Sequence, residues 1–172
     1  RHENPQKGRL RQFRQFNLEI LGTPKSIADA LIIRTLTTIL EEYGFKDLVV
    51  DINSMGDKET RPTFIKELTN YYKKHLESLC KDCHERIKTN PLRLLDCKQE
   101  QCQPFKDNAP SSLSYLSNDA RSHFKEVLQY LEEMGIAYRV NNSLVRGLDY
   151  YTRTVFEVIK VDVDENGKER EI

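Results

Sequence analysis

The 172-residue sequence has 38% hydrophobic and 31% charged residues, which is typical of a soluble globular protein and excludes a collagen-like or disordered chain. Its 27 basic and 27 acidic side chains give a formal net charge of zero, so overall charge does not favour a nucleic-acid partner. The sequence has neither an apolar run long enough to span a bilayer nor the apolar block of a signal peptide. This predicts a cytoplasmic protein with no membrane partner. Because the sequence begins without methionine in a charged segment, we expect a fragment of a longer chain.

The first 21 residues combine local positive charge with the alternation of a β-strand. Five basic residues stand against the single acid Glu3 between positions 1 and 14, which predicts an anionic partner. Over residues 9–21, a strand would place polar and aromatic side chains on one face, namely Arg9, Arg11, Phe13, Gln15, Asn17 and Glu19. The opposite face becomes apolar, with Phe16, Leu18 and Ile20. We therefore predict a hairpin with one face that is wet or binds a ligand.

A helix, a strand and a second helix are predicted next. Thr23 followed by Pro24 is typical of a helix start, and apolar residues at helical spacing continue to Gly44. The apolar run at residues 48–53 predicts a buried strand. The second helix is predicted over residues 59–79, where Pro62 fits only in the first turn.

Residues 80–110 lack a clear periodicity, and we expect turns and short pieces there. A third helix is predicted to begin at residue 118 or 119 and to end at Gly135. His75 and His123 lie among charged and polar residues of the predicted helices. We interpret both as solvated and assign them no role.

The last part of the chain is again rich in β-branched and aromatic residues, which predicts strands at 136–140 and 150–161. A polar hairpin with its turn at Asn166-Gly167 is expected to follow. Strands at both ends thus flank a helical middle, which predicts an α+β fold. Residues 1–55 and 136–172 are expected to form the sheet domain, and residues 56–135 a mainly helical inserted domain.

Two groups of residues could bind a ligand. On the first strand, Phe13 could stack on a flat ring, Gln15 could hold an amine and Glu19 could accept from an N–H donor. Arg1, Arg9 and Arg11 could hold phosphates, since guanidinium groups match phosphate oxygens. The second group is Arg146, beside Gly147, with Tyr150 and Tyr151. The alternatives are an ordinary solvated sheet face for the first group and sheet-packing tyrosines in the second.

The four cysteines form a third group, with the spacing Cys80-x2-Cys83 and Cys97-x4-Cys102 and with His84 adjacent. The first pair has the spacing of metal ligands and the second is looser. Disulfides are not expected in a cytoplasmic protein. A structural zinc site and reduced thiols that pack as small apolar residues both remain open. Neither a nucleophile elbow nor a glycine-rich phosphate loop is present, so hydrolase chemistry has no support.

Two long motifs carry a resemblance to a known family. The segment RHENPQKGRLRQFRQFNLEILG resembles motif 2 of class II aminoacyl-tRNA synthetases in its histidyl form. LVRGLDYYTRTVFE is similar to the histidine-specific motif of histidyl-tRNA synthetases, and VDINSMGDKETR and TNPLRLLDCK also resemble that family. The resemblance covers nearly the whole chain except about the last dozen residues. It implies an antiparallel-sheet class II catalytic core with an inserted helical domain.

The resemblance also implies roles for individual residues. For ATP, Arg1 would hold the α-phosphate, Glu3 and Arg9 would make further contacts, and Phe13 would stack on adenine. For histidine, Gln15 would bind the α-amino group, and Glu19 would read the imidazole together with Tyr150 and Tyr151. Arg146 would contact both the α-phosphate and the substrate carboxylate.

As an enzyme, such a ligase would use ATP with Mg²⁺, form histidyl-adenylate and transfer histidine to the 3′ end of tRNA(His). The resemblance implies a homodimer whose inserted domain lies near the tRNA acceptor arm. One departure is Asp29-Ala30-Leu31, where the family usually has Asp-Ala-Glu. The sequence also lacks motif 1, motif 3 and the anticodon-binding domain, so we expect the fragment alone to be inactive.

Two alternatives remain. A non-catalytic regulatory paralogue, like the synthetase-like subunit of ATP phosphoribosyltransferase, would bind histidine as a signal. Such paralogues usually lack the inserted domain and have a degraded motif 2. Here the insertion is present and motif 2 is intact. A module that docks on the acceptor arm through a zinc-supported insertion is compatible with the main interpretation.

Overall fold

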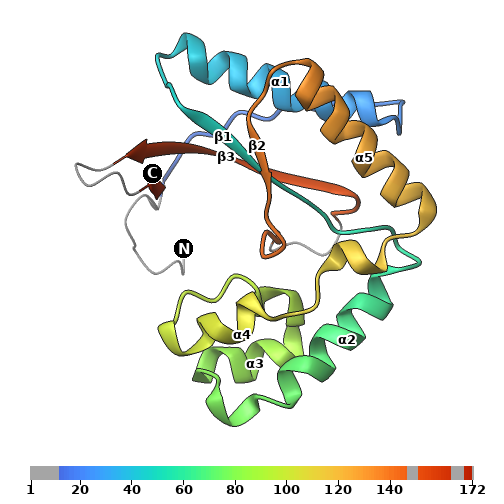
Figure 1. Ribbon diagram of the computed structural model, residues 1–172, viewed down its shortest axis with the longest axis vertical. Helices are drawn as coiled ribbons and strands as arrows, with labels where there is room; N and C mark the ends of the chain where they lie inside the picture. The colour runs from blue at the N-terminus through green and yellow to red at the C-terminus, as the bar shows by residue number, and fades with distance from the viewer. Residues whose placement is uncertain (1–11, 147–150, 164–168, 172) are drawn as a thin grey trace.

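The computed structural model describes residues 12–146, 151–163 and 169–171, and it has the predicted α+β fold (Figure 1). Four strands form one sheet in the order β2–β1–β3–β4. Their bounds are Leu48–Ser54 for β1, Tyr138–Val140 for β2, Thr154–Val163 for β3 and Glu169–Glu171 for β4. β1 pairs parallel with β2 and antiparallel with β3, and β3 pairs antiparallel with β4. The turn predicted at Asn166-Gly167 lies outside the described residues.

Two long helices, α1 (Ser26–Glu42) and α5 (Asn118–Glu133), lie side by side above the sheet in Figure 1. Both were predicted. α5 begins where the Ser117 hydroxyl accepts from the Ala120 N–H, and it ends at Gly135, whose positive φ of 68° suits a residue without Cβ. α1 starts later than predicted, at Ser26, because the backbone of Lys25 is extended (φ −76°, ψ 144°), which makes Lys25 the N-cap residue. In the described parts of the chain, no helix is long and apolar enough to cross a membrane.

One hydrophobic core packs against β1 and a second lies beyond its end. Val50 and Ile52, both fully buried, point to α1 and α5 and pack with Ile33, Phe124, Val127, Leu131 and Ile136. The second core lies beyond the end of β1, where Met55 joins a cluster built on Phe64, Leu68 and Tyr72. Because side chains alternate along a strand, Asp51 and Asn53 are directed away from α1 and α5.

The second core belongs to a group of short helices that we call the small helical unit, residues 61–107, which lies below the sheet in Figure 1. Its elements are α2 (Arg61–Lys73), η1 (Leu76–Ser78), α3 (Lys81–Thr89), η2 (Pro91–Leu94), η3 (Glu100–Cys102) and α4 (Gln103–Asp107). A further turn, η4 (Ser112–Tyr115), leads back to α5. The predicted helix 59–79 is therefore shorter, since it ends at Lys73.

The predicted inserted domain, residues 56–135, packs in two different ways. The small helical unit packs around the second core, whereas α5 packs on α1 and on β1. The boundaries at residues 56 and 135 stay a prediction.

The strand predicted at residues 9–21 is absent from its described part, residues 12–21. Phe16 is 77% exposed and Leu21 86% exposed, so the apolar face of the predicted strand is not buried against a described element. A strand needs a neighbour that satisfies its backbone N–H and C=O groups, and the sheet order places none of its four strands against this segment. For these residues the prediction of a hairpin is wrong.

Asp57 connects the start of α2 with the start of α5. Its Oδ1 accepts from the Thr60 N–H (2.9 Å), the Thr60 hydroxyl (2.8 Å) and the Glu59 N–H (3.1 Å), and the Ser117 hydroxyl donates to its Oδ2. The bond from Ser117 contributes most, followed by those from Thr60, and together they lower the pKa of Asp57 from 3.8 to about 2 although burial opposes this. One carboxylate thus holds two helix starts together.

We expect Asp57→Asn to lower the free energy of unfolding at pH 7 by about 1 kcal/mol, the usual size of a lost helix cap. Because the folded-state pKa is lowered, the stabilisation is complete above the unfolded value of 3.8 and is lost as pH falls through about 2. The difference between wild type and variant should therefore shrink over that interval. Urea unfolding across this pH range measures it, with the exposed Asp107→Asn as a control; a difference that is independent of pH would contradict the assignment.

Candidate functional site

The residues predicted at the start of the chain are not brought to a common site by the described structure. Arg1, Glu3 and Arg9 lie outside the described residues. The Phe13 side chain is 69% exposed, and Gln15 and Glu19 are exposed as well. Gln15 Nε2 donates to Asn17 Oδ1 (3.3 Å). The roles of these residues stay predictions.

Arg146 lies on the wall of a cavity of about 710 Å³ between the sheet and the small helical unit. The sheet side of this cavity is lined by Asp51, Asn141, Arg146, Glu157 and Ile159, and the helical side by Arg86, Arg93, Asp96, Lys98 and Lys106, among others. Charges of both signs therefore surround one hollow. Such a lining suits a ligand that itself carries both an anionic and a cationic group.

Glu157 is the direct partner of Arg146. Arg146 Nη1 donates to Glu157 Oε1 at 2.6 Å, and the two side chains are 42% and 49% exposed. An ion pair as exposed as this contributes little to stability, so a ligand carboxylate or phosphate can compete for the guanidinium. Glu157 was not identified as a site residue from the sequence. The signal that could have identified it is an acidic residue inside a strand that is otherwise rich in β-branched residues.

Asp51, in the middle of β1, forms the floor of the cavity. It is 2% exposed, and its carboxylate accepts from Arg139 Nε, from Arg139 Nη2 (3.2 Å) and from Asn141 Nδ2 (2.7 Å). A buried charge persists only when it is paired and hydrogen-bonded, as it is here. These bonds fix β2 and the first residue of the loop that leads to Arg146.

Asn53, two residues further along β1, holds the next part of that loop. It is fully buried, and its Nδ2 donates to the Leu144 carbonyl at 3.1 Å and to the Asn142 carbonyl at 3.5 Å. Its Oδ1 accepts from the Ser112 hydroxyl at 3.3 Å. The loop that carries Arg146 is thus positioned from a single strand face, by Asp51 and Asn53.

The two predicted tyrosines have different outcomes. Tyr150 lies outside the described residues. Tyr151 is partly buried and packs against the core of the small helical unit, and its carbonyl accepts from Arg61 Nη1 at 2.8 Å. A role for either tyrosine in binding histidine stays a prediction.

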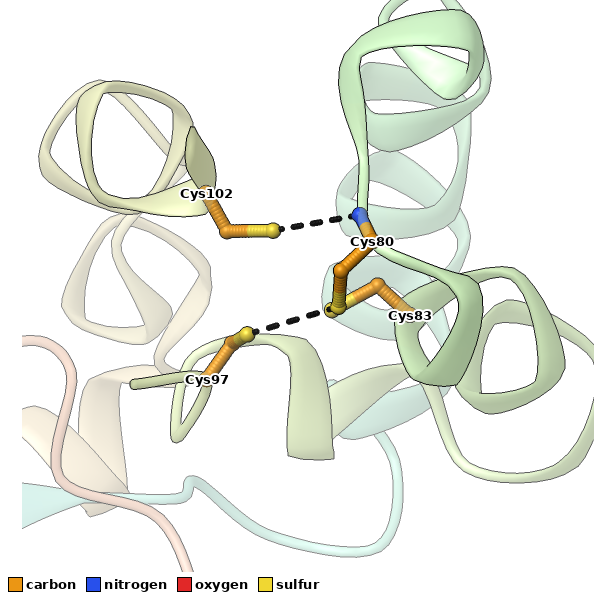
Figure 2. A group of neighbouring side chains, drawn as sticks. All are labelled: Cys80, Cys83, Cys97 and Cys102. Carbon is orange, nitrogen blue, oxygen red and sulfur yellow. Dashed lines mark hydrogen bonds between the residues drawn. The ribbon is translucent and has the colours of Figure 1, made fainter. Parts of the chain in front are cut away.

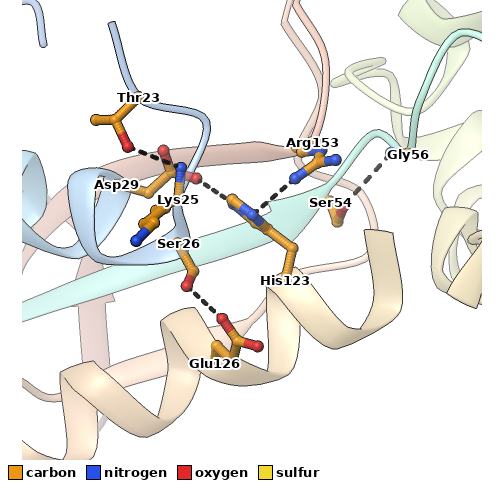
Figure 3. A network of polar contacts seen from close by, with 9 residues as sticks. All are labelled: Thr23, Lys25, Ser26, Asp29, Ser54, Gly56, His123, Glu126 and Arg153. Carbon is orange, nitrogen blue, oxygen red and sulfur yellow. Dashed lines mark hydrogen bonds and ion pairs between the residues drawn. The ribbon is translucent and has the colours of Figure 1, made fainter. Parts of the chain in front are cut away.

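His123, predicted to be solvated, is instead buried at the centre of a polar network (Figure 3). Its Nε2 lies 2.8 Å from Asp29 Oδ2, and its Nδ1 lies 2.9 Å from Arg153 Nη1. Because arginine can only donate, Nδ1 must accept, which leaves the ring proton on Nε2 to be donated to Asp29. The earlier interpretation was wrong because helix spacing alone did not show that α1 and the start of β3 converge on this side chain.

Arg153 connects this network to the end of β1. Its φ of 58° is unusual for a residue with a side chain. Its N–H donates to the Gly56 carbonyl, and its carbonyl accepts from the Met55 N–H, each at 2.7 Å. His123 therefore holds the segment that follows Tyr151 against α1 and α5.

The four cysteines converge on one point (Figure 2). Their Sγ atoms all lie within 4.8 Å of one another, and the Sγ atoms of Cys80 and Cys97 are 3.8 Å apart. The Cys80 N–H donates to Cys102 Sγ at 3.4 Å. Cys83, Cys97 and Cys102 are buried, and Cys80 is half-buried. All four are free thiols, and the group can hold a metal ion.

The surroundings of these thiols differ. Burial foremost raises the pKa of Cys83, and burial also raises that of Cys102. Burial opposes ionisation of Cys80 as well, but hydrogen bonds from the Cys83 backbone and from the other thiols lower its pKa. The pKa is therefore lowered at Cys80 and raised at Cys83 and Cys102.

Comparison with known proteins relates the chain to one family. It is 44% identical over 163 residues to the histidine–tRNA ligase of Desulforamulus reducens, covering 95% of this chain and 39% of that protein. It is 48% identical over 158 residues to the histidine–tRNA ligase of Halothermothrix orenii, covering 92% of this chain and 38% of that protein. Over more than nine tenths of its length the chain is similar to histidine–tRNA ligases.

The chain spans about two fifths of the length of these histidine–tRNA ligases, 39% and 38%. Among solved structures, the apo histidyl-tRNA synthetase of S. aureus matches with a TM-score of 0.62 and 29% identity, covering 87% of this chain and 35% of that one. No protein-family model matches the chain. The structural match agrees with the α+β fold described above.

We expect His123→Ala to lower the free energy of unfolding by about 2–3 kcal/mol, because it leaves Asp29 and Arg153 without the partner that joins them. His123→Gln should recover part of this loss, since an amide both donates and accepts. Chemical denaturation of both variants measures the effect, with the exposed Lys125→Ala on the same helix as a control. Wild-type stability in His123→Ala would show that the network does not hold the fold.

Proposed function

We propose that this chain supplies part of the catalytic core of a histidine–tRNA ligase. In the proposed reaction, ATP and histidine form histidyl-adenylate, and the histidine then passes to the 3′ end of tRNA(His). The observation that carries the proposal is Arg146, which lies within LVRGLDYYTRTVFE and lines the cavity with Glu157 beside it. The identity to histidine–tRNA ligases over most of the chain supports it.

The chemistry follows from charge. A histidine carboxylate oxygen attacks the α-phosphorus of ATP, and pyrophosphate leaves. Negative charge builds on the phosphate oxygens during the attack, so guanidinium groups held in place lower the barrier by electrostatic stabilisation and by alignment. Arg146 and Arg1 are the proposed catalytic groups, and no covalent link to the enzyme is needed.

Glu157 has a place in this scheme. It holds the Arg146 guanidinium at the cavity wall through a short, exposed hydrogen bond. A substrate carboxylate or phosphate then shares the guanidinium, which has further N–H donors to offer. The rigid floor at Asp51 and Asn53 limits how far the loop can move, and this keeps the alignment.

The remaining substrate contacts follow the family resemblance. Glu3, Arg9 and Phe13 are proposed to bind ATP with Arg1. Histidine is proposed to lie against Gln15, Glu19, Tyr150, Tyr151 and Arg146. Mg²⁺ prefers carboxylate and phosphate oxygens, and Asp82, Asp96 and Glu157, which line the cavity, are carboxylates that would hold it together with ATP. When bound, the ion would offset phosphate charge.

We also propose that the tRNA acceptor arm approaches the small helical unit. Arg86, Arg93, Lys98 and Lys106 line the helical side of the cavity, and phosphates are the natural partners of such groups. The division into core segments 1–55 and 136–172 and an inserted domain 56–135 belongs to this proposal. The proposal also includes assembly of the full-length protein into a homodimer.

The second candidate is a regulatory paralogue that binds histidine without activating it. The same cavity could hold histidine through Arg146 and Glu157 with no ATP present. The two candidates differ in one property, because only the ligase exchanges pyrophosphate into ATP when histidine is added.

We expect histidine-dependent ATP–pyrophosphate exchange in the full gene product that contains this sequence, and little in the 172 residues alone. Arg146→Ala should lower the exchange rate by about 10²–10³-fold, as expected for loss of one group that stabilises developing charge. Glu19→Gln should weaken discrimination between histidine and other amino acids, because the imidazole N–H loses its acceptor.

Arg121→Ala, an exposed arginine of α5, is the matched control and should exchange at the wild-type rate. Exchange that survives in Arg146→Ala would remove Arg146 from the catalytic role. A folded full-length protein that binds histidine but shows no exchange would favour the regulatory paralogue.

A further inference from the structure

We propose that Cys80, Cys83, Cys97 and Cys102 form a tetrathiolate site for a structural Zn²⁺ ion that ties the small helical unit together. The proposal does not depend on the catalytic function, because it concerns only how these residues are held. It chooses between the two interpretations that the cysteine spacing leaves open.

The distances between the four sulfur atoms are close to those that a tetrahedral metal site requires. Tetrahedral zinc with Zn–S bonds of roughly 2.3 Å requires sulfur atoms roughly 3.8 Å apart. The Cys80 and Cys97 Sγ atoms are 3.8 Å apart, and all four lie within 4.8 Å of one another. Small side-chain rotations therefore suffice to complete the tetrahedron (Figure 2).

The cysteines come from separate short pieces of chain, which argues against simple filling of a core. Cys80 directly precedes α3 and Cys83 lies in its first turn, whereas Cys97 follows η2 and Cys102 ends η3. Core packing asks only that apolar groups touch. Here the polarisable sulfur atoms of all four side chains meet at one point.

Zinc is favoured over other ions by the ligand set. Four sulfur atoms select a soft or borderline cation, whereas Mg²⁺ and Ca²⁺ require oxygen. On binding, the four thiols release four protons to solvent, so the centre carries a net charge of −2. The Cys80 N–H, which already donates to Cys102 Sγ at 3.4 Å, would stabilise that charge.

A bound zinc ion would stabilise the small helical unit more than the rest of the protein. Its elements α3, η2, η3 and α4 contain nine, four, three and five residues, and isolated helices of that length are not stable in water. One ion would join the chain between residues 80 and 102 at four points, and because the four ligands come together only in the folded chain, its binding free energy adds to the free energy of folding. Asp96 and Lys98, the neighbours of Cys97, line the Arg146 cavity, so the same ion would fix part of that wall.

The test is metal content and cobalt spectroscopy on the purified protein. We expect about one zinc per chain by mass spectrometry of the metal, and four thiols that react with Ellman's reagent only after chelation or denaturation. Exchange of zinc for Co²⁺ should give the intense visible bands of tetrahedral cobalt with a thiolate charge-transfer band. A folded protein that takes up neither Zn²⁺ nor Co²⁺ would overturn the proposal, with no variant needed.

Variants identify the ligands. Cys97→Ser should lose the metal and the cobalt charge-transfer bands, while circular dichroism reports whether the total helix content of the protein is retained. His84→Ala is the matched control, because His84 is adjacent to Cys83 but lies outside the sulfur cluster, and it should keep its zinc. Retention of one zinc in Cys97→Ser, or its loss in His84→Ala, would refute the tetrathiolate assignment.

Discussion

The buried polar face of β1 is the constraint on which the site depends. Val50 and Ile52 point into the core under α1 and α5, and Asp51 and Asn53, which alternate with them, therefore point to the other side of the sheet. There they hold β2 and the loop that ends at Arg146. A slip of one residue in the pairing of β1 would place a carboxylate in an apolar core, so the register that builds the core is the same register that positions the loop.

The protein joins two cores of different strength. The upper core combines two long amphipathic helices with a sheet, which is a sufficient basis for a stable fold. The small helical unit has shorter elements and a core that includes three cysteines. Asp57, the Arg153 backbone and the Arg61 contact with the Tyr151 carbonyl join the two regions. The cavity with Arg146 lies where they meet, so its shape depends on both.

The sequence predicted the elements whose pattern is local and missed those that need a distant partner. The helix that ends near Gly44, the strand at residues 48–53 and the third helix were confirmed, because apolar periodicity and caps are properties of a few neighbouring residues. The strand expected at residues 9–21 was wrong for its described part, since alternation does not supply a neighbouring strand. The same limit applies to His123, whose partners Asp29 and Arg153 are 94 and 30 residues away.

The order of β1 and its neighbours has a consequence for how the chain folds. Ile52 pairs with Val140 in β2 and with Phe156 in β3, so the central ladder cannot form until a long stretch of chain has been brought back. Such non-local pairings are slow because the entropy of loop closure must be overcome first. Early collapse of the small helical unit would shorten the effective loop between β1 and β2. The small helical unit, which forms one wall of the cavity, can thus also make the pairing of β1 with β2 faster.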